Sequence, residues 1–213
     1  MANEIERRFI PRGAGEVRAK KADDGKVGIA GTGAVFETLS DEIFGFREKI
    51  AVGAFDKALK TSDIRGLFNH DPNMILGRVS AKTMRTWADK DGLHYEIAEL
   101  PASRADVAEA VQRGDVTGNS FSFTVAKDEW EYKDDHKAIR TITEFEELFD
   151  VGPVVYPAYP ATQVSARAKE MAEKRKDEPP PPPPPKEPEP ELPNFALERE
   201  RVLLAEIEQD LAG

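Results

Sequence analysis

Alternating apolar and polar residues predict β-strands through the middle of the chain. The clearest alternation lies in residues 92–100, GLHYEIAEL, which place leucine, tyrosine and isoleucine on one face. Residues 120–132, SFSFTVAKDEWEY, alternate in the same way, with phenylalanines on one face and hydroxyl residues on the other. Residues 26–37 and 138–162 contain β-branched residues spaced as in further strands, and residues 63–79 are typical of a strand, a turn and a strand. Strands therefore dominate the predicted fold.

Two short segments instead have helical spacing. Residues 53–60, GAFDKALK, and residues 103–115, SRADVAEAVQRGD, repeat their apolar residues at intervals that place them on one helix face. We expect Ser103 to cap the second helix and Gly114 to end it. Two helices are too few for a doubly wound parallel sheet. We therefore predict a mainly β fold (α+β), an antiparallel sheet or barrel with the helices packed outside.

Glycines in residues 26–37, KVGIAGTGAVFE, superficially resemble a phosphate-binding loop. Gly28, Gly31 and Gly33 do not have the spacing of the dinucleotide fingerprint, and no Lys-Ser or Lys-Thr pair follows them. We therefore predict that these glycines form a bulge or a close packing contact within a sheet.

Composition divides the chain of 213 residues into four regions. Residues 1–24 are charged without a clear period, and we expect a mobile arm there. Residues 25–167 hold the predicted strands and helices and form the folded domain. Residues 168–193 are a charged, proline-rich linker, in which the proline tract 179–185 favours a stiff polyproline II spacer. Residues 194–213 have the narrow apolar stripe of a short amphipathic helix, which we expect to pair with a partner.

Composition also narrows the class of function. The net charge of −10 argues against general nucleic-acid binding, which requires a basic surface. The chain has no cysteine, so disulfides, thiolate metal sites and a cysteine nucleophile are excluded. No apolar run is long enough to span a bilayer, and the first residues have no apolar signal-peptide core, so we expect a cytosolic protein.

One of the three histidines lies in a position that suits chemistry. His94 lies inside an alternating strand and is typical of a surface residue, whereas His136 lies in the charged run YKDDHKA, typical of a hairpin tip. His70 ends an apolar run and enters a turn with Asp71 and Pro72, and such a turn can hold an imidazole at a strand end. The alternative is a structural role, in which His70 bonds the backbone of its own turn.

A serine paired with His70 is the chemistry that these residue types favour. Serine becomes a nucleophile when a base takes its proton, and a third group holds the base in the right tautomer. Ser120 and Ser122 lie on one face of the same predicted strand, so the alternation leaves both as candidates. No second histidine lies near His70, so a metal site is weakly indicated, and we expect no metal or cofactor.

Six blocks of sequence between Lys26 and Arg167 follow one another in the order of a known family. They are GTGAVFETLSD, FREKIAVGAFDKALK, RGLFNHDPNMILGR, GLHYEIAELPAS, AEAVQRGDVTGNSFSF and LFDVGPVVYPAYPAT. In these blocks the chain resembles the prohead (capsid maturation) proteases of tailed bacteriophages, which are related in fold to the herpesvirus protease assemblin. The resemblance implies an open antiparallel β-barrel of the herpesvirus-protease type, flanked by helices.

The resemblance further implies a serine endopeptidase that cuts capsid scaffold segments during assembly. Its partners would be the scaffold segment of the major capsid protein, other prohead proteins and the chain itself, through autocleavage or a homo-oligomer. It would work in the host cytoplasm, packaged inside the immature procapsid, without a membrane, nucleic acid or cofactor. Residues 194–213 would dock on scaffold or capsid protein, or begin a fused scaffold segment. The alternative is a catalytically decayed assembly factor or binding module with the same fold.

The resemblance also implies roles for individual residues. The family's histidine lies in its NHD block, which matches His70, and its serine follows the GDVxGxS block, which matches Ser120. Many members have glycine where this chain has Ser122, so that serine departs from the family pattern. Asp150 matches the acidic residue of a later strand, with Glu147 as the second choice.

Three further positions complete these expectations. Gly152 replaces a serine of the family pattern. Assemblin uses a second histidine as its third catalytic residue, and we reject His136 for this role because it lies in a charged loop upstream of the strand. Backbone N–H groups would stabilise the oxyanion, with Arg78 as an extra donor; a surface salt bridge is the alternative role of Arg78.

Overall fold

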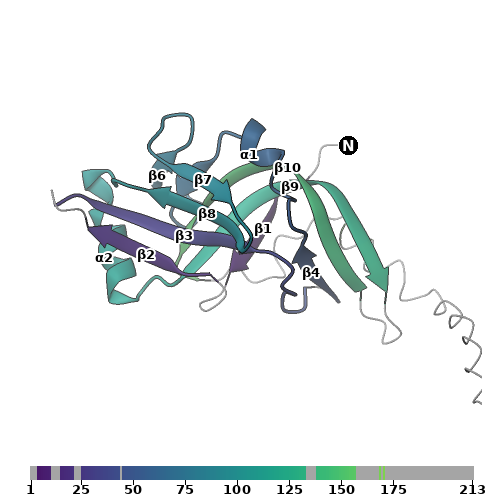
Figure 1. Ribbon diagram of the computed structural model, residues 1–213. Helices are drawn as coiled ribbons and strands as arrows, with labels where there is room; N and C mark the ends of the chain where they lie inside the picture. The colour runs from purple at the N-terminus through teal and green to yellow at the C-terminus, as the bar shows by residue number, and fades with distance from the viewer. Residues whose placement is uncertain are drawn as a thin grey trace, which may run out of the picture. The chain divides into compact units, whose positions relative to one another are not determined.

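Two β-sheets make up the described part of the chain in the computed structural model (Figure 1). The structure describes residues 4–10, 15–21, 25–43, 45–132 and 138–156, together with residues 168 and 170. The first sheet contains β1 (Glu6–Ile10), β4 (Phe46–Ile50), β5 (Arg65–Leu67), β6 (Ile75–Arg78), β9 (Gly118–Tyr132) and β10 (Ala138–Val154). The second contains β2 (Val17–Lys21), β3 (Val27–Val35), β7 (Arg85–Ala88) and β8 (Gly92–Ile97). The helical segments are α1 (Ala58–Thr61), a 3-10 turn (Ala102–Arg104) and α2 (Ala105–Arg113).

The first sheet is organised around β10, which is 17 residues long. One edge of β10 pairs antiparallel with β9, and Figure 1 shows these two strands as two long arrows that curve side by side. The other edge pairs in parallel with two short strands, β4 beside residues 138–142 and β5 beside residues 150–151. β1 lies on the outer edge of β9, and β6 lies on the outer edge of β5.

The structure confirms a mainly β fold and corrects the predicted barrel. Neither of the sheets that the described residues form closes on itself, and two of the strand pairs in the first sheet are parallel. The physical reason is that alternation shows which face of a strand is buried. It does not show which strand pairs with which, or in what direction. Pairing depends on contacts between residues far apart in the chain.

The glycines of β3 are close packing contacts, as predicted. A Cβ atom added at Gly28 would lie 2.4 Å from the carbonyl oxygen of Ile97 on the neighbouring strand. A Cβ atom at Gly33 would lie 2.5 Å from the side chain of Val151, which belongs to the other sheet. These glycines therefore let the two sheets and their strands approach closely, and no phosphate loop is formed.

Phenylalanine rings fill the centre of the hydrophobic core, which draws side chains from both sheets. Phe55, from the turn before α1, stacks on Phe145 of β10 with ring centroids 4.4 Å apart. Phe121 and Phe123 of β9 pack on the same rings and are fully buried. Burial of each such ring stabilises a fold by about 1.5–3 kcal/mol, so this cluster fixes β9, β10 and α1 against one another.

Helix α2 confirms the second predicted helix and its end. Gly114 follows the helix in the left-handed conformation, with φ of 82°, and its N–H donates to the carbonyl of Val111. Ser103 does not cap the helix but lies inside the 3-10 turn, and among the described residues no side chain caps α2. None of the helices in the described ranges is long and apolar enough to cross a membrane.

Two strands occupy the region in which we expected an arm without regular structure. β1 and β2 both lie within residues 1–24, and each pairs with a neighbour over its full length. β1 escapes detection because its buried positions include charged side chains: Glu6 is 2% exposed and Arg8 is 8% exposed. A pattern that treats charged residues as solvent-facing cannot recognise such a strand.

Five side chains from four strands form a buried charge cluster, consisting of Glu6, Arg8, Glu48, Asp128 and Arg140. Arg140 lies at its centre, with Nε 2.9 Å from Oδ2 of Asp128 and Nη1 2.8 Å from Oε2 of Glu6. Arg8 lies beside it, with Nε 2.7 Å from Oε1 of Glu48. The cluster therefore joins β1, β4, β9 and β10 at the end of the first sheet.

The cluster also makes stability depend on pH. Burial alone would raise the pKa of Glu6, but hydrogen bonds and charges of Arg140 and Arg8 outweigh it and hold this pKa below its ordinary value of 4.5. A carboxyl whose pKa is lower in the folded chain stabilises the fold above its ordinary pKa. That contribution is lost as the pH falls.

Several predicted features lie outside the described residues. They are His136, the proline tract 179–185 and the helix expected for residues 194–213, and they stay predictions. Ala168, by contrast, is described and buried, and packs in a small apolar cluster with Phe46 and its neighbours. The folded part of the chain thus includes residues beyond the end of β10.

Arg140→Met should destabilise the fold strongly. It removes the central cation and leaves the three buried carboxylates of the cluster with one arginine, Arg8, which costs about 3–5 kcal/mol. Arg85→Met is the matched control, because Arg85 is 69% exposed and its ion pair with Glu96 should contribute less than about 1 kcal/mol. Urea unfolding followed by circular dichroism measures both free energies. Equal small losses in the two variants would contradict the role of the cluster.

Candidate active site

Three side chains from separate parts of the chain form one line of hydrogen bonds. The imidazole of His70 has Nδ1 2.5 Å from Oδ1 of Asp150 and Nε2 2.6 Å from Oγ of Ser120. A carboxylate can only accept hydrogen bonds, so Nδ1 of a neutral imidazole donates to Asp150 and Nε2 accepts from the hydroxyl. The site is buried: the side chains of His70 and Asp150 are 9% and 8% exposed, and Ser120 is 1% exposed.

The register between β9 and β10 places the serines and the acid on one face. Ser122 lies opposite Asp150, and Ser120 lies opposite Gly152. Side chains alternate between the two faces of a strand, so residues two apart share a face. The phenylalanines between and beyond the serines fill the core on the other face. The Gly-Asn-Ser-Phe-Ser-Phe pattern thus serves the core and the site at once.

The turn that carries His70 is tied to β10, the strand that carries Asp150. Asn69 donates its backbone N–H to the carbonyl of Pro153, 3.0 Å away, and its side-chain oxygen accepts from the N–H of Val155 at 2.8 Å. Asn69 and His70 both have left-handed backbones, with φ of 55° and 58°. Such conformations are uncommon outside glycine and occur often at functional sites. The anchored turn fixes the imidazole over β9.

The close packing around residue 152 explains why it is a glycine. A Cβ atom at this position would lie 2.1 Å from the carbonyl oxygen of Leu67 in β5. Leu67 lies three residues before His70, so any side chain here would push away the segment that leads into the histidine turn. Glycine at this position is therefore a requirement of the close approach between β5 and β10 in this chain.

The structure distinguishes the two serines that the sequence left equivalent. Oγ of Ser120 lies against His70, whereas Oγ of Ser122 donates a short hydrogen bond to Oδ2 of Asp150. Asp150 therefore has one carboxylate oxygen on the imidazole and the other on Ser122. Sequence reasoning missed this contact, although the spacing of two residues between the serines signals that both hydroxyls reach one face. Oγ of Ser120 also lies 3.0 Å from the carbonyl oxygen of Arg8 in β1.

Two of the predicted site residues are not brought to the imidazole. Glu147 lies opposite Thr124 in the register and is exposed, so the second choice for the acid is not supported. Arg78 donates from Nε to Oδ2 of Asp63 at 2.8 Å and holds the pKa of that carboxyl well below its usual range. The surface salt bridge, the alternative role for Arg78, is the contact that the structure shows.

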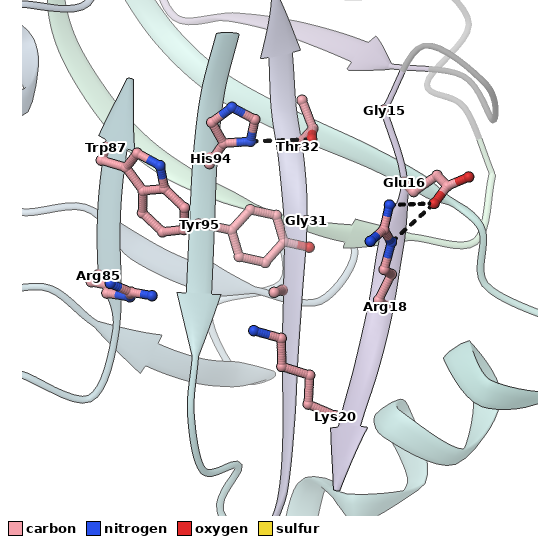
Figure 2. A pocket seen from close by; sticks show the side chains of 11 residues that line it. Gly15, Glu16, Arg18, Lys20, Gly31, Thr32, Arg85, Trp87, His94 and Tyr95 are labelled. Atoms are coloured by element: carbon pink, nitrogen blue, oxygen red, sulfur yellow. Dashed lines mark hydrogen bonds and ion pairs between the residues drawn. The ribbon is translucent and has the colours of Figure 1, made fainter. Parts of the chain in front are cut away.

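His94 lies away from these residues, on the outer face of the second sheet, where it lines a shallow pocket (Figure 2). It stacks on Trp87 with ring centroids 5.5 Å apart, and its Nδ1 lies 3.2 Å from the hydroxyl of Thr32. The side chain is 18% exposed, so His94 is a partly covered surface residue. Across the described ranges, no group of three or more histidine, aspartate or glutamate side chains is arranged to hold a metal ion.

Hydrogen bonds in the order aspartate, histidine, serine connect the acid, base and nucleophile of serine proteases, a class recognised by geometry and not by chain order. The family model described as Caudovirus prohead serine protease matches residues 14–177. The chain belongs to this family, which confirms the resemblance found in the sequence and indicates a phage capsid maturation protease. Comparisons with curated proteins and with solved structures give no significant match.

Gly152→Ala should disturb both the fold and the site. The added methyl group must displace β5, and overpacking of this kind costs about 1–3 kcal/mol. The histidine turn moves with β5, so reaction of the site with a fluorophosphonate should fall as well. Gly25→Ala is the control, because a Cβ atom there meets no atom within 4 Å and tests only the cost of a left-handed backbone. An equal effect of the two changes on fluorophosphonate reaction would contradict the packing argument.

Proposed function

We propose that this chain is a serine endopeptidase that cleaves scaffold or propeptide segments of capsid proteins during prohead maturation. The observation that carries the proposal is the line of hydrogen bonds from Asp150 through His70 to Ser120, in a chain of the prohead serine protease family. Ser120 is the nucleophile, His70 is the general base, and Asp150 orients the imidazole. The protease acts inside the immature procapsid, next to its substrates.

Acylation starts with the hydroxyl proton of Ser120. Oγ attacks the carbonyl carbon of the scissile bond while Nε2 of His70 accepts the proton. The same proton then passes from Nε2 to the leaving amine, the C–N bond breaks, and an acyl ester remains on the serine. A water molecule that gives its proton to His70 hydrolyses the ester and restores the hydroxyl.

Asp150 and Ser122 support the base and do not react. The carboxylate of Asp150 keeps the proton on Nδ1 of His70, so that Nε2 faces the nucleophile, and its charge stabilises the imidazolium that forms. Ser122 donates to the second carboxylate oxygen and so restrains the carboxylate from rotating. We assign the oxyanion to backbone N–H groups of the site, because the guanidinium of Arg78 is bound elsewhere.

A catalytically decayed assembly factor is the second candidate. The departures at Ser122 and Gly152 are the observations that favour it. The contacts of these two residues argue against a decayed site. Ser122 donates a hydrogen bond to Asp150, and Gly152 leaves space for the segment that leads to His70. A decayed site would have no reason to keep the serine, imidazole and carboxylate in hydrogen-bonded order.

Ser120→Ala should abolish cleavage of the capsid protein of the same phage when the two proteins are produced together. Loss of the nucleophile lowers the rate by about 10³-fold or more. Ser122→Ala, the matched control, removes one hydrogen bond to a charged group and should lower the rate by about 10–100-fold. Mass spectrometry of the capsid protein measures both. Cleavage that persists in Ser120→Ala would refute the nucleophile, and no cleavage by the unaltered chain inside procapsids would favour the decayed factor.

The tail provides a separate function, which we propose to be recruitment. Residues 179–213 would act as a spacer and a docking helix for scaffold or capsid protein, and the proline-rich part would be a site of self-cleavage. Deletion of residues 179–213 preserves both the family match, which ends at residue 177, and the buried Ala168. The truncated chain should cleave a peptide at the normal rate but enter procapsids in about tenfold lower amount. Unchanged incorporation would contradict the docking role.

A further inference from the structure

The nucleophile of the proposed protease is covered by the amino-terminal strand. Ser120 is 1% exposed, and its Oγ lies beside Nε2 of His70 and the carbonyl oxygen of Arg8. A hydroxyl has one proton, so it cannot donate to both acceptors at once. While β1 is in place, its backbone therefore competes with the catalytic base for the proton that the reaction must transfer.

β1 lies where an extended peptide would bind. Among the strands that the structure describes it is the outermost of the first sheet, and its one partner there is β9, antiparallel, from Glu6 opposite Phe123 to Ile10 opposite Asn119. The edge that it covers is the edge of the strand that carries Ser120. Peptides commonly bind such an edge as an added strand, through main-chain hydrogen bonds. β1 and an added peptide strand cannot occupy it together.

We propose that the edge of β9 beside Ser120 is the binding site for an extended substrate peptide and that β1 is its built-in competitor, which must leave before substrate is cleaved. This inference rests on the proposed function. It adds to that function the conformation of the substrate, its place in the sheet and the segment that blocks it.

Phe9 marks one subsite of this edge. It lies opposite Ser120 in the register, and its ring covers Gly118, where an added Cβ atom would lie 2.2 Å from the ring. Because residue 118 has no side chain, a large apolar side chain of the neighbouring strand can lie directly over the backbone of β9. A substrate that replaces β1 in the same register would place an aromatic or large aliphatic side chain there.

The buried charge cluster holds β1, but its other members stay paired when β1 leaves. β1 supplies one anion and one cation, Glu6 and Arg8, so the net charge of the cluster is the same with β1 and without it. The cation at the centre keeps carboxylate partners on β4 and β9.

Two further observations mark β1 as an accessory strand. Nε of Arg7, which lies opposite Ser122, is buried without a hydrogen-bond partner in the part of the chain that the structure describes, so β1 is imperfectly satisfied in its place. The family match begins at residue 14, after β1 has ended.

Exchange of β1 can be measured without catalysis. The probe is a fluorescein-labelled peptide of residues 4–11, EIERRFIP, and the readout is fluorescence anisotropy with full-length chains that carry Ser120→Ala. Adding E6Q and R8Q removes the charges that hold β1, and the peptide should then bind about tenfold more tightly or better. Adding E16Q and R18Q instead is the matched control, because this exposed pair, at the start of β2 and just before it, has the same residue types and spacing. Its peptide affinity should equal that of Ser120→Ala alone.

The same assay tests the subsite. A peptide with alanine in place of Phe9 should bind about tenfold more weakly to the E6Q/R8Q chain. If all folded chains bind the first peptide with equal affinity, the exchange of β1 is overturned. If the two peptides bind with equal affinity, the apolar subsite over Gly118 is overturned. If the E6Q/R8Q chain does not fold, hydrogen exchange of Ser120→Ala decides. Amides of β1 should exchange about tenfold faster than those of β10, and equal protection overturns the proposal.

A second measurement separates this proposal from the proposed function. With Ser120 intact, E6Q/R8Q should react with a fluorophosphonate about tenfold faster than the unaltered chain, and E16Q/R18Q should not. Failure of all three chains to react, together with peptide exchange in the anisotropy assay, would contradict the serine protease and leave the competing strand intact. Reaction at one equal rate would sustain the protease and overturn the competing strand.

Discussion

The register between β9 and β10 is the constraint on which the site depends. With Ser122 opposite Asp150 and Ser120 opposite Gly152, both hydroxyls and the carboxylate share one face, and the phenylalanines between them fill the core on the other. A slip of one residue would exchange the two faces of β9, burying hydroxyls in the aromatic core and directing rings at His70. The packing of the phenylalanine rings therefore fixes the register of β9, and this register sets the positions of Ser120, Ser122 and Asp150 on the other face.

β10 organises both ends of the first sheet. Near its start, Arg140 lies at the centre of the buried charge cluster beside β4. Near its end, Asp150 lies beside β5, which leads into the histidine turn. Of the two short parallel strands on this edge, β4 carries Glu48, which contacts Arg140, and β5 leads to His70, which contacts Asp150. Close approach of β5 requires glycine at residue 152, because a side chain there would displace the segment that leads into the histidine turn.

More of the candidate site than of the fold could be predicted from the sequence. The strands around residues 92–100 and 120–132, helix α2 and the turn at His70 could be predicted, because alternation, helical spacing and turn residues are local signals. β1 could not, since Glu6 and Arg8 are buried by partners that lie far away in the chain. The same reason hid the parallel pairing of β4 and β5. The bond from Ser122 to Asp150 depends on the register between strands, which no single segment encodes.

The most direct test of the account is the position of a covalent adduct. The unaltered chain is treated with a fluorophosphonate and digested, and mass spectrometry locates the modified residue within residues 114–123. The hydrogen bond from Ser120 to His70 predicts an adduct on Ser120 and none on Ser122, whose hydroxyl is bound to Asp150. An adduct on Ser122, or an unmodified segment in a chain whose β1 has been released, would contradict the assignment of Ser120 as the nucleophile.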